Sequence, residues 1–127
     1  MTTTAPATLA IAEVVERTGV SAHTLRYYER IGLLDGVDRN AAGQRRFTDG
    51  HLDWLSLIRC LRESGMPIAD IARYAQLVRA GDDTVPERIR LLQAHDRRIR
   101  EQIAALRDQQ RYIQRKIGYY REAGPAA

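Results

Sequence analysis

Residues 21–30, SAHTLRYYER, contain the signals that decide the fold. Ser21 can cap the N-terminus of a helix, because its side-chain oxygen can accept a hydrogen bond from a backbone N–H of the first turn. Leu25 and Tyr28 lie three residues apart and therefore share one apolar face of that helix. Gly19, just upstream, suits a sharp turn because a residue without a Cβ adopts a positive φ at little cost. The stretch predicts the second helix of a helix–turn–helix.

The rest of the upstream part predicts three more short helices and a loop. Apolar periodicity places a helix over residues 11–18, another from residue 48 or 49 to 64, and another over residues 67–81. Residues 36–47, GVDRNAAGQRRF, are rich in turn formers and end in two arginines and a phenylalanine. We expect this loop to form a basic hairpin, or wing, beside the helix of residues 22–31.

The downstream part predicts one long helix over residues 84–121. Thr84 and Glu87 have the spacing of a capping box. Beyond them a heptad seam alternates steps of three and four, and its two polar interruptions, Asp96 and Gln110, could control the register of a dimer. The apolar seam positions are Ile89, Leu92, Ile99, Ile103, Leu106, Ile113 and Ile117. Such a helix would be about 57 Å long. A small upstream lobe cannot bury so long a seam, so we expect a partner helix.

Length and charge set wide bounds on function. The 127 residues correspond to one small domain with an appendage, and residues 1–8 and 122–127 read as disordered tails. The net charge is +4, and nineteen of the twenty basic residues are arginine, which codon usage explains as well as phosphate binding does. Residues 1–80 hold ten basic and nine acidic residues, so the lobe is almost neutral. The charge permits an anionic partner without requiring one.

Cys60 is the single cysteine of the chain. One thiol excludes an intrachain disulfide, a four-cysteine iron–sulfur site and a cysteine-rich zinc site. The histidines, His23, His51 and His95, lie on separate predicted elements, so we expect no metal and no cofactor. The apolar runs are too short to span a membrane, and residues 1–20 lack a secretory leader. We therefore expect a soluble, cytoplasmic protein that binds no membrane.

Two groups of side chains could contact DNA. The predicted helix of residues 22–31 exposes donors suited to base edges and phosphates: His23, Thr24, Arg26, Tyr27 and Arg30. Arg45 and Arg46 end the wing, where they would reach backbone phosphates. Taken alone, the helices fit any small α domain equally well, and the two wing arginines fit a solvated loop better. Together they favour a winged helix–turn–helix.

Seven short stretches of the upstream part form a recognisable set of motifs: Ile11-Ala12-Glu13-Val14, Thr18-Gly19-Val20-Ser21, Thr24-Leu25-Arg26-Tyr27-Tyr28-Glu29, Gly32-Leu33-Leu34, Gly43 to Phe47, Leu61-Arg62 and Gly65-Met66. On these residues the chain resembles the MerR family of bacterial transcription regulators. The chain departs from the family at the wing, where Gln44 and Phe47 replace common tyrosines, and at His51, where an acidic residue often completes a cap.

The resemblance implies a mainly α fold. A winged helix–turn–helix DNA-binding lobe would span residues 9–81, with the helix–turn–helix at 11–30, followed by a dimerisation helix over 84–121. It further implies a homodimer joined by an antiparallel coiled coil, which binds an inverted repeat in double-stranded promoter DNA with a long spacer. Such a dimer distorts the DNA so that RNA polymerase holoenzyme engages both promoter hexamers.

The resemblance also implies which residues contact DNA. By motif position, Thr24, Arg26 and Tyr27 would do so from the recognition helix, and Arg45 and Arg46 from the wing. The full candidate set adds the other exposed donors of these two elements: Ser21, His23, Arg30 and Arg39.

Cys60 is the candidate effector-sensing residue. A small apolar filler on a helix flank accounts for it well, whereas a partly exposed thiol near arginines would suit reaction with electrophiles. A short subgroup that the chain resembles responds to aldehydes and places its one cysteine in this helix. The resemblance thus implies a small electrophile as effector.

Two other functions stay open from the residues. One is an effector-independent architectural DNA-binding protein built on the same lobe, and the other is a coiled-coil adaptor that binds protein alone. An enzyme is not expected, because no paired acid–base residues, nucleotide-binding loop or nucleophile–base spacing occurs.

Overall fold

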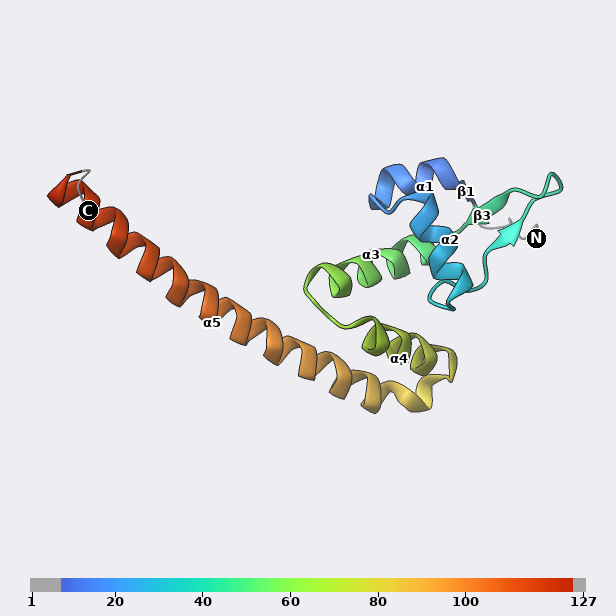
Figure 1. Ribbon diagram of the computed structural model, residues 1–127. Helices are drawn as coiled ribbons and strands as arrows, with labels where there is room; N and C mark the ends of the chain where they lie inside the picture. The colour runs from blue at the N-terminus through green and yellow to red at the C-terminus, as the bar shows by residue number, and fades with distance from the viewer. Residues whose placement is uncertain (1–7, 125–127) are drawn as a thin grey trace, which may run out of the picture. The chain divides into compact units, whose positions relative to one another are not determined.

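The computed structural model describes residues 8–124, and these form two compact units that divide between Val85 and Pro86. Of the tail expected over residues 1–8, all but Thr8 lies outside the described residues. The first unit is the lobe, and the second is a helix (Figure 1).

The lobe contains the expected helices, each ending within two residues of its predicted bounds (Figure 1). A short 3₁₀ helix, η1, closes the unit. In chain order the elements are β1 (Leu9–Ala10), α1 (Ile11–Thr18), α2 (Ala22–Arg30), β2 (Asp38–Arg39), β3 (Arg45–Phe47), α3 (Asp49–Glu63), α4 (Ile68–Arg79) and η1 (Asp82–Thr84).

The wing is a hairpin of β2 and β3, as the sequence predicts, but it belongs to a three-stranded antiparallel sheet in the order β1-β3-β2. Strand β1 pairs Leu9 with Phe47 and Ala10 with Arg46. The sequence did not predict this strand, because two residues carry no alternation pattern. Strand β1 ties the chain segment before α1 to the wing.

The core of the lobe draws apolar side chains from α1, α2, α3, α4 and β3. Phe47, which the sequence placed in the exposed wing, is fully buried. It therefore anchors the wing in the core instead of facing outward. The other largest fully buried side chains are Leu25, Leu33, Leu55, Ile58, Ile71 and Val14.

Local signals explain the turn between α1 and α2. Gly19 has a φ of 71°, and its N–H donates to the carbonyl of Val15 at 2.9 Å. Thr18 Oγ1 donates to the carbonyl of Val14 at 2.7 Å and accepts from the N–H of Val20. The Thr18 hydroxyl and the N–H groups of Gly19 and Val20 are thus paired within the turn itself.

Two side-chain caps begin α2 and α3. Ser21 Oγ accepts from the N–H of Thr24 at 3.1 Å, which confirms the predicted cap. At α3, Thr48 and His51 form a reciprocal capping box, in which the imidazole of His51 accepts from the N–H of Thr48 at 2.9 Å. The histidine therefore does the work of the acidic residue common at this position.

The second unit consists of α5 from Pro86 onward, and the whole helix has 39 residues, Val85–Ala123. It begins one residue later than expected, because Thr84 ends η1 and its hydroxyl donates to the carbonyls of Leu77 and Gly81. It also continues two residues beyond Arg121, which shortens the tail expected over 122–127. Within residues 8–124, no helix is both long and apolar enough to cross a membrane.

The turn of the helix–turn–helix predicts a stability difference between two glycines. Gly19 and Gly43 both have positive φ, so alanine is strained at both. A Cβ on Gly19 would also fall on the guanidinium of Arg59, which donates to the carbonyl of Thr18, whereas a Cβ on Gly43 meets nothing. Urea unfolding followed by Trp54 fluorescence should find Gly19→Ala about 1 kcal/mol more destabilising than Gly43→Ala.

An Arg59→Ala background provides the control for this comparison. With the guanidinium removed, the two alanine substitutions should cost similar free energies of unfolding. A difference that persists in this background would show that the extra cost at Gly19 has another source.

Candidate nucleic-acid interface

The outer face of α2 presents the side chains that the sequence predicts. His23, Arg26 and Arg30 are exposed, while Leu25 and Tyr28 face the core. The guanidinium of Arg30 lies over the exposed ring of Tyr27, 5.5 Å from its centroid. This stacking holds a cation and an aromatic ring together on the same face.

The side chains of Ser21 and Thr24 form hydrogen bonds at the N-terminus of α2. Ser21 Oγ donates to Thr24 Oγ1 at 2.9 Å and accepts from the N–H of Thr24. Both hydroxyls are therefore engaged in the cap that begins α2. They fix the start of the helix, which positions the exposed residues that follow.

The wing arginines are anchored by other parts of the lobe. Arg45 Nε donates to both carboxylate oxygens of Glu29, at 2.8 and 3.1 Å. Arg46 donates to the hydroxyl and the carbonyl of Thr8, at 3.0 and 2.9 Å. Arg39 Nη1 donates to the carbonyl of Gly43 at 2.8 Å. The wing is therefore not a loop of solvated side chains, because each of these guanidinium groups has a partner within the lobe.

The tip of the wing is closed by Asn40. Its Oδ1 accepts from the N–H groups of Ala42 and Gln44, and its Nδ2 donates to Gln44 Oε1 at 3.1 Å. Gln44, which replaces a tyrosine common in the wing of the resembled family, thus stabilises the turn.

A small groove joins α2 to the wing. Its volume is about 220 Å³, and Arg26 from α2 meets Arg39 and Arg45 from the wing along its walls. The ion pair of Glu29 with Arg45 bridges the same two elements. Arg45 retains its Nη atoms for a further acceptor, because Glu29 engages Nε. Three guanidinium groups around one groove suit an anion such as a backbone phosphate.

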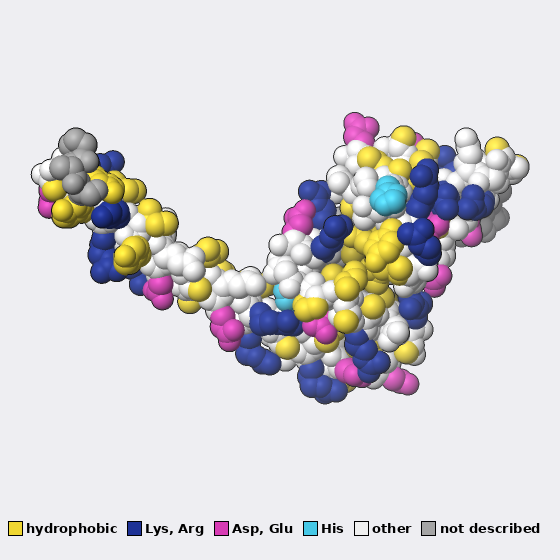
Figure 2. Space-filling model, viewed as in Figure 1, with side chains coloured by type: hydrophobic (Ala, Val, Ile, Leu, Met, Phe, Trp, Pro, Cys, Tyr) yellow, Lys and Arg dark blue, Asp and Glu magenta, His cyan; other side chains and the backbone are white. Residues whose placement is uncertain are grey.

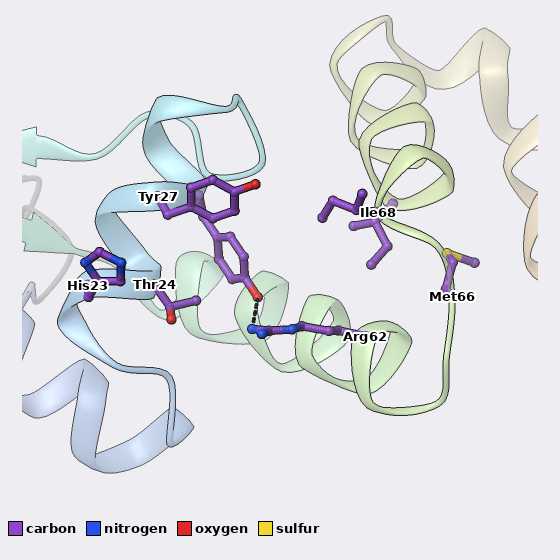
Figure 3. Close-up of a pocket in the computed structure, with 8 residues that line it drawn as sticks. His23, Thr24, Tyr27, Arg62, Met66 and Ile68 are labelled. Atoms are coloured by element: carbon purple, nitrogen blue, oxygen red, sulfur yellow. Dashed lines mark hydrogen bonds between the residues drawn. The ribbon is translucent and has the colours of Figure 1, made fainter.

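A second groove lies on the other side of α2, between α2 and the α3–α4 segment (Figure 3). We call it the α2–α4 groove. Its volume is about 480 Å³, and Arg62 Nη1 donates to the Tyr28 hydroxyl at 3.2 Å within it. The described residues that line it are His23, Thr24, Tyr27, Tyr28, Arg62, Met66, Ile68 and Ile71.

Sequence reasoning missed the positions of Glu29, Arg59 and Arg62 at these surfaces. Arg59 lines a neighbouring pocket with Arg62 and pairs with Glu63 at 2.7 Å. The sequence signal for Arg59 and Arg62 was their spacing, since residues three apart share one face of α3.

The remaining candidate residues lie away from these grooves. Cys60 is exposed on α3, and Ser64 donates to its backbone carbonyl at 2.7 Å. Within residues 8–124, no His, Cys, Asp and Glu side chains group closely enough to hold a metal ion. On α5, the seam residues Ile89, Ile103, Leu106, Ile113 and Ile117 are exposed.

Two family models match the chain. A model described as "MerR HTH family regulatory protein" matches residues 9–77, and one described as "MerR, DNA binding" matches residues 52–116. Together they extend from β1 into α5.

Individual relatives are regulators as well. An uncharacterized HTH-type transcriptional regulator of Haemophilus influenzae is 41% identical over 116 residues, covering 91% of this chain and 86% of the relative. The HTH-type transcriptional regulator AdhR of Bacillus subtilis is 39% identical over 82 residues, 65% of this chain and 59% of AdhR.

A solved structure is similar over most of the chain. The crystal structure of HiNmlR, a MerR family regulator lacking the sensor domain, bound to promoter DNA, is 41% identical. The similarity covers 92% of this chain and 93% of that one, with a TM-score of 0.83.

Proposed function

The chain belongs to the MerR family and is a DNA-binding transcription regulator, and from this premise we propose how it acts. It acts as a homodimer on an inverted repeat in a promoter with a long spacer. It distorts that DNA so that RNA polymerase holoenzyme engages both promoter hexamers. A reactive aldehyde or related electrophile controls this activity through Cys60.

The groove between α2 and the wing carries the proposed DNA contacts. Arg26, Arg39 and Arg45 line it from two elements that an ion pair holds together. In the proposed complex α2 enters the major groove, where Arg26 reaches a base edge. Arg45 uses its free Nη atoms on a backbone phosphate. Promoter DNA bound to the similar HiNmlR supports this assignment.

The exposed seam of α5 supports a homodimer. Leu106 is 63% exposed although it is a seam leucine, and a second α5 would cover it. The two polar interruptions of the seam favour an antiparallel pair. An antiparallel pair centred near Ile103 places Asp96 opposite Gln110, whereas a parallel pair in register would place Asp96 opposite a second Asp96.

The exposed thiol of Cys60 supports an electrophile response. A thiol at the surface of α3 is accessible to a small aldehyde. Its sulfur would add to the carbonyl carbon and its proton would move to the carbonyl oxygen, which gives a hemithioacetal. Because α3 also carries Arg59 and Arg62 beside the recognition helix, a modified α3 would change how the lobe holds DNA.

The DNA-contact assignment predicts distinct effects for Arg26 and Arg45. A duplex selected from a random-sequence library by the purified protein provides the probe. Arg26→Ala should weaken binding to it by about 1–3 kcal/mol and relax the base preference at one position. Arg45→Gln should weaken binding to all duplexes and lower the salt slope by about one.

Arg97 is exposed on α5 outside the heptad seam, so Arg97→Ala is the matched control and should leave duplex binding unchanged. If Arg26→Ala binds the selected duplex as tightly as the parent protein, α2 does not read bases through this residue.

The dimer assignment predicts a contrast on α5. Leu106 lies on the heptad seam, whereas Tyr112 is 69% exposed at a position outside it. Leu106→Glu should produce monomers in sedimentation at concentrations where the parent protein is dimeric, because it buries a charge at the seam. Tyr112→Glu should remain dimeric. Equal behaviour of the two variants would contradict the seam assignment.

The sensing assignment predicts that Cys60→Ser abolishes the aldehyde response. In transcription with purified RNA polymerase, formaldehyde should change the output of the parent protein but not that of the serine variant. Both should bind the selected duplex with equal affinity without aldehyde. An unchanged aldehyde response in Cys60→Ser would remove the thiol from the mechanism.

A further inference from the structure

We infer that the α2–α4 groove binds a compact apolar anion such as an aryl carboxylate. The ligand would compete with DNA for α2, and this competition rests on the function proposed above. The site itself rests on the groove alone. The size of the groove, its apolar walls and Arg62, an arginine without a carboxylate partner among the described residues, all point to the same class of ligand.

The size and walls of the groove suit a small aromatic body. A volume of about 480 Å³ lies within the range of small-molecule sites, which is roughly 300–1,000 Å³. Ile71 and Met66 are buried and form apolar wall, while Ile68 and Tyr27 remain 51% and 40% exposed. Figure 3 shows Ile68 across from Tyr27. A ligand between them would remove apolar surface of both from water.

Hydrophobic side chains also gather visibly on this lobe. The face shown in Figure 2 has a hydrophobic patch with Lys and Arg side chains beside it. Apolar patches with a polar rim mark interaction sites more often than bare surface does. A ligand with an apolar body and one negative charge satisfies both parts of such a surface.

Arg62 supplies the positive charge. Its Nη1 donates to the Tyr28 hydroxyl at 3.2 Å, which fixes the guanidinium at the groove. Among the described residues no carboxylate pairs with Arg62. The neighbouring carboxylate on the same helix, Glu63, pairs with Arg59. None of the described residues that line the groove is acidic. The fixed fork of arginine suits a carboxylate, which it can bind through two parallel hydrogen bonds.

Occupancy of the groove is linked to DNA binding through α2. His23, Thr24 and Tyr27 line the groove and are also candidate DNA contacts. A ligand seated against them and a duplex lying on α2 would exclude each other. By thermodynamic linkage, the ligand must lower the affinity for the duplex by the same factor by which the duplex lowers the affinity for the ligand.

Methyl NMR of the full chain, labelled at isoleucine and methionine methyls, tests the site with naphthoate as the probe. The methyl signals of Met66, Ile68 and Ile71 should shift and saturate, while those of Ile103 and Ile113 on α5 should not. Neutral naphthamide, which has the same ring system, should bind at least about tenfold more weakly, because it lacks the charge that Arg62 binds.

Two variants with matched controls separate the charge from the walls. Arg62→Gln should weaken the binding of naphthoate about tenfold and remove the preference for naphthoate over naphthamide. Arg100→Gln on α5 should do neither. Ile68→Ser should weaken both compounds, whereas Ile31→Ser, also half-exposed but outside the groove, should weaken neither. Trp54 fluorescence during urea unfolding verifies that each variant folds.

The outcomes distinguish the site from the proposed function. If naphthoate shifts none of the three groove methyls, or if Arg62→Gln binds it unchanged, the inference is overturned. If the selected duplex shifts these methyls and naphthoate does not, the groove is part of the DNA surface alone. If naphthoate binds as described but no duplex binds, the ligand site holds and the DNA-binding assignment of α2 fails.

Discussion

The ion pair between Glu29 and Arg45 fixes the wing against the recognition helix, and the proposed DNA-binding surface depends on it. The two side chains are about three-quarters buried, so solvent screens their attraction less than it screens a surface pair. Phe47 anchors the same strand in the core two residues later. The partly buried ion pair and the apolar anchor of Phe47 together hold the wing at a fixed place beside α2.

Local features of the sequence predicted much of the fold. Ser21 and Gly19 marked the turn between α1 and α2, since a cap and a positive φ act within a few residues. The heptad seam likewise predicted α5 to within two residues at each end. Strand β1 could not be predicted, because its pairing with β3 joins segments about 37 residues apart and leaves no periodic trace.

The candidate site was less predictable than the fold. The sequence showed that Arg45 and Arg46 are basic, but not that Glu29 and Thr8 hold them in place. Such partners are set by the packing of helices and strands, which places distant residues together. The α2–α4 groove has the same origin, because three separate segments contribute its walls. Residue types can therefore suggest a contact, while the geometry decides which atoms remain available for it.

Because the seam of α5 is uncovered in a single chain, the concentration of the protein itself would control how much of it is dimeric. In the proposed dimer each half-site is bound by a separate copy, so tight binding requires two chains to meet first. Below the dissociation constant of the dimer, the concentration of the active species rises with the square of the total concentration. A modest change in synthesis or degradation of the chain would then produce a larger change in promoter occupancy. Expression level could set the threshold of such a regulator even without any effector.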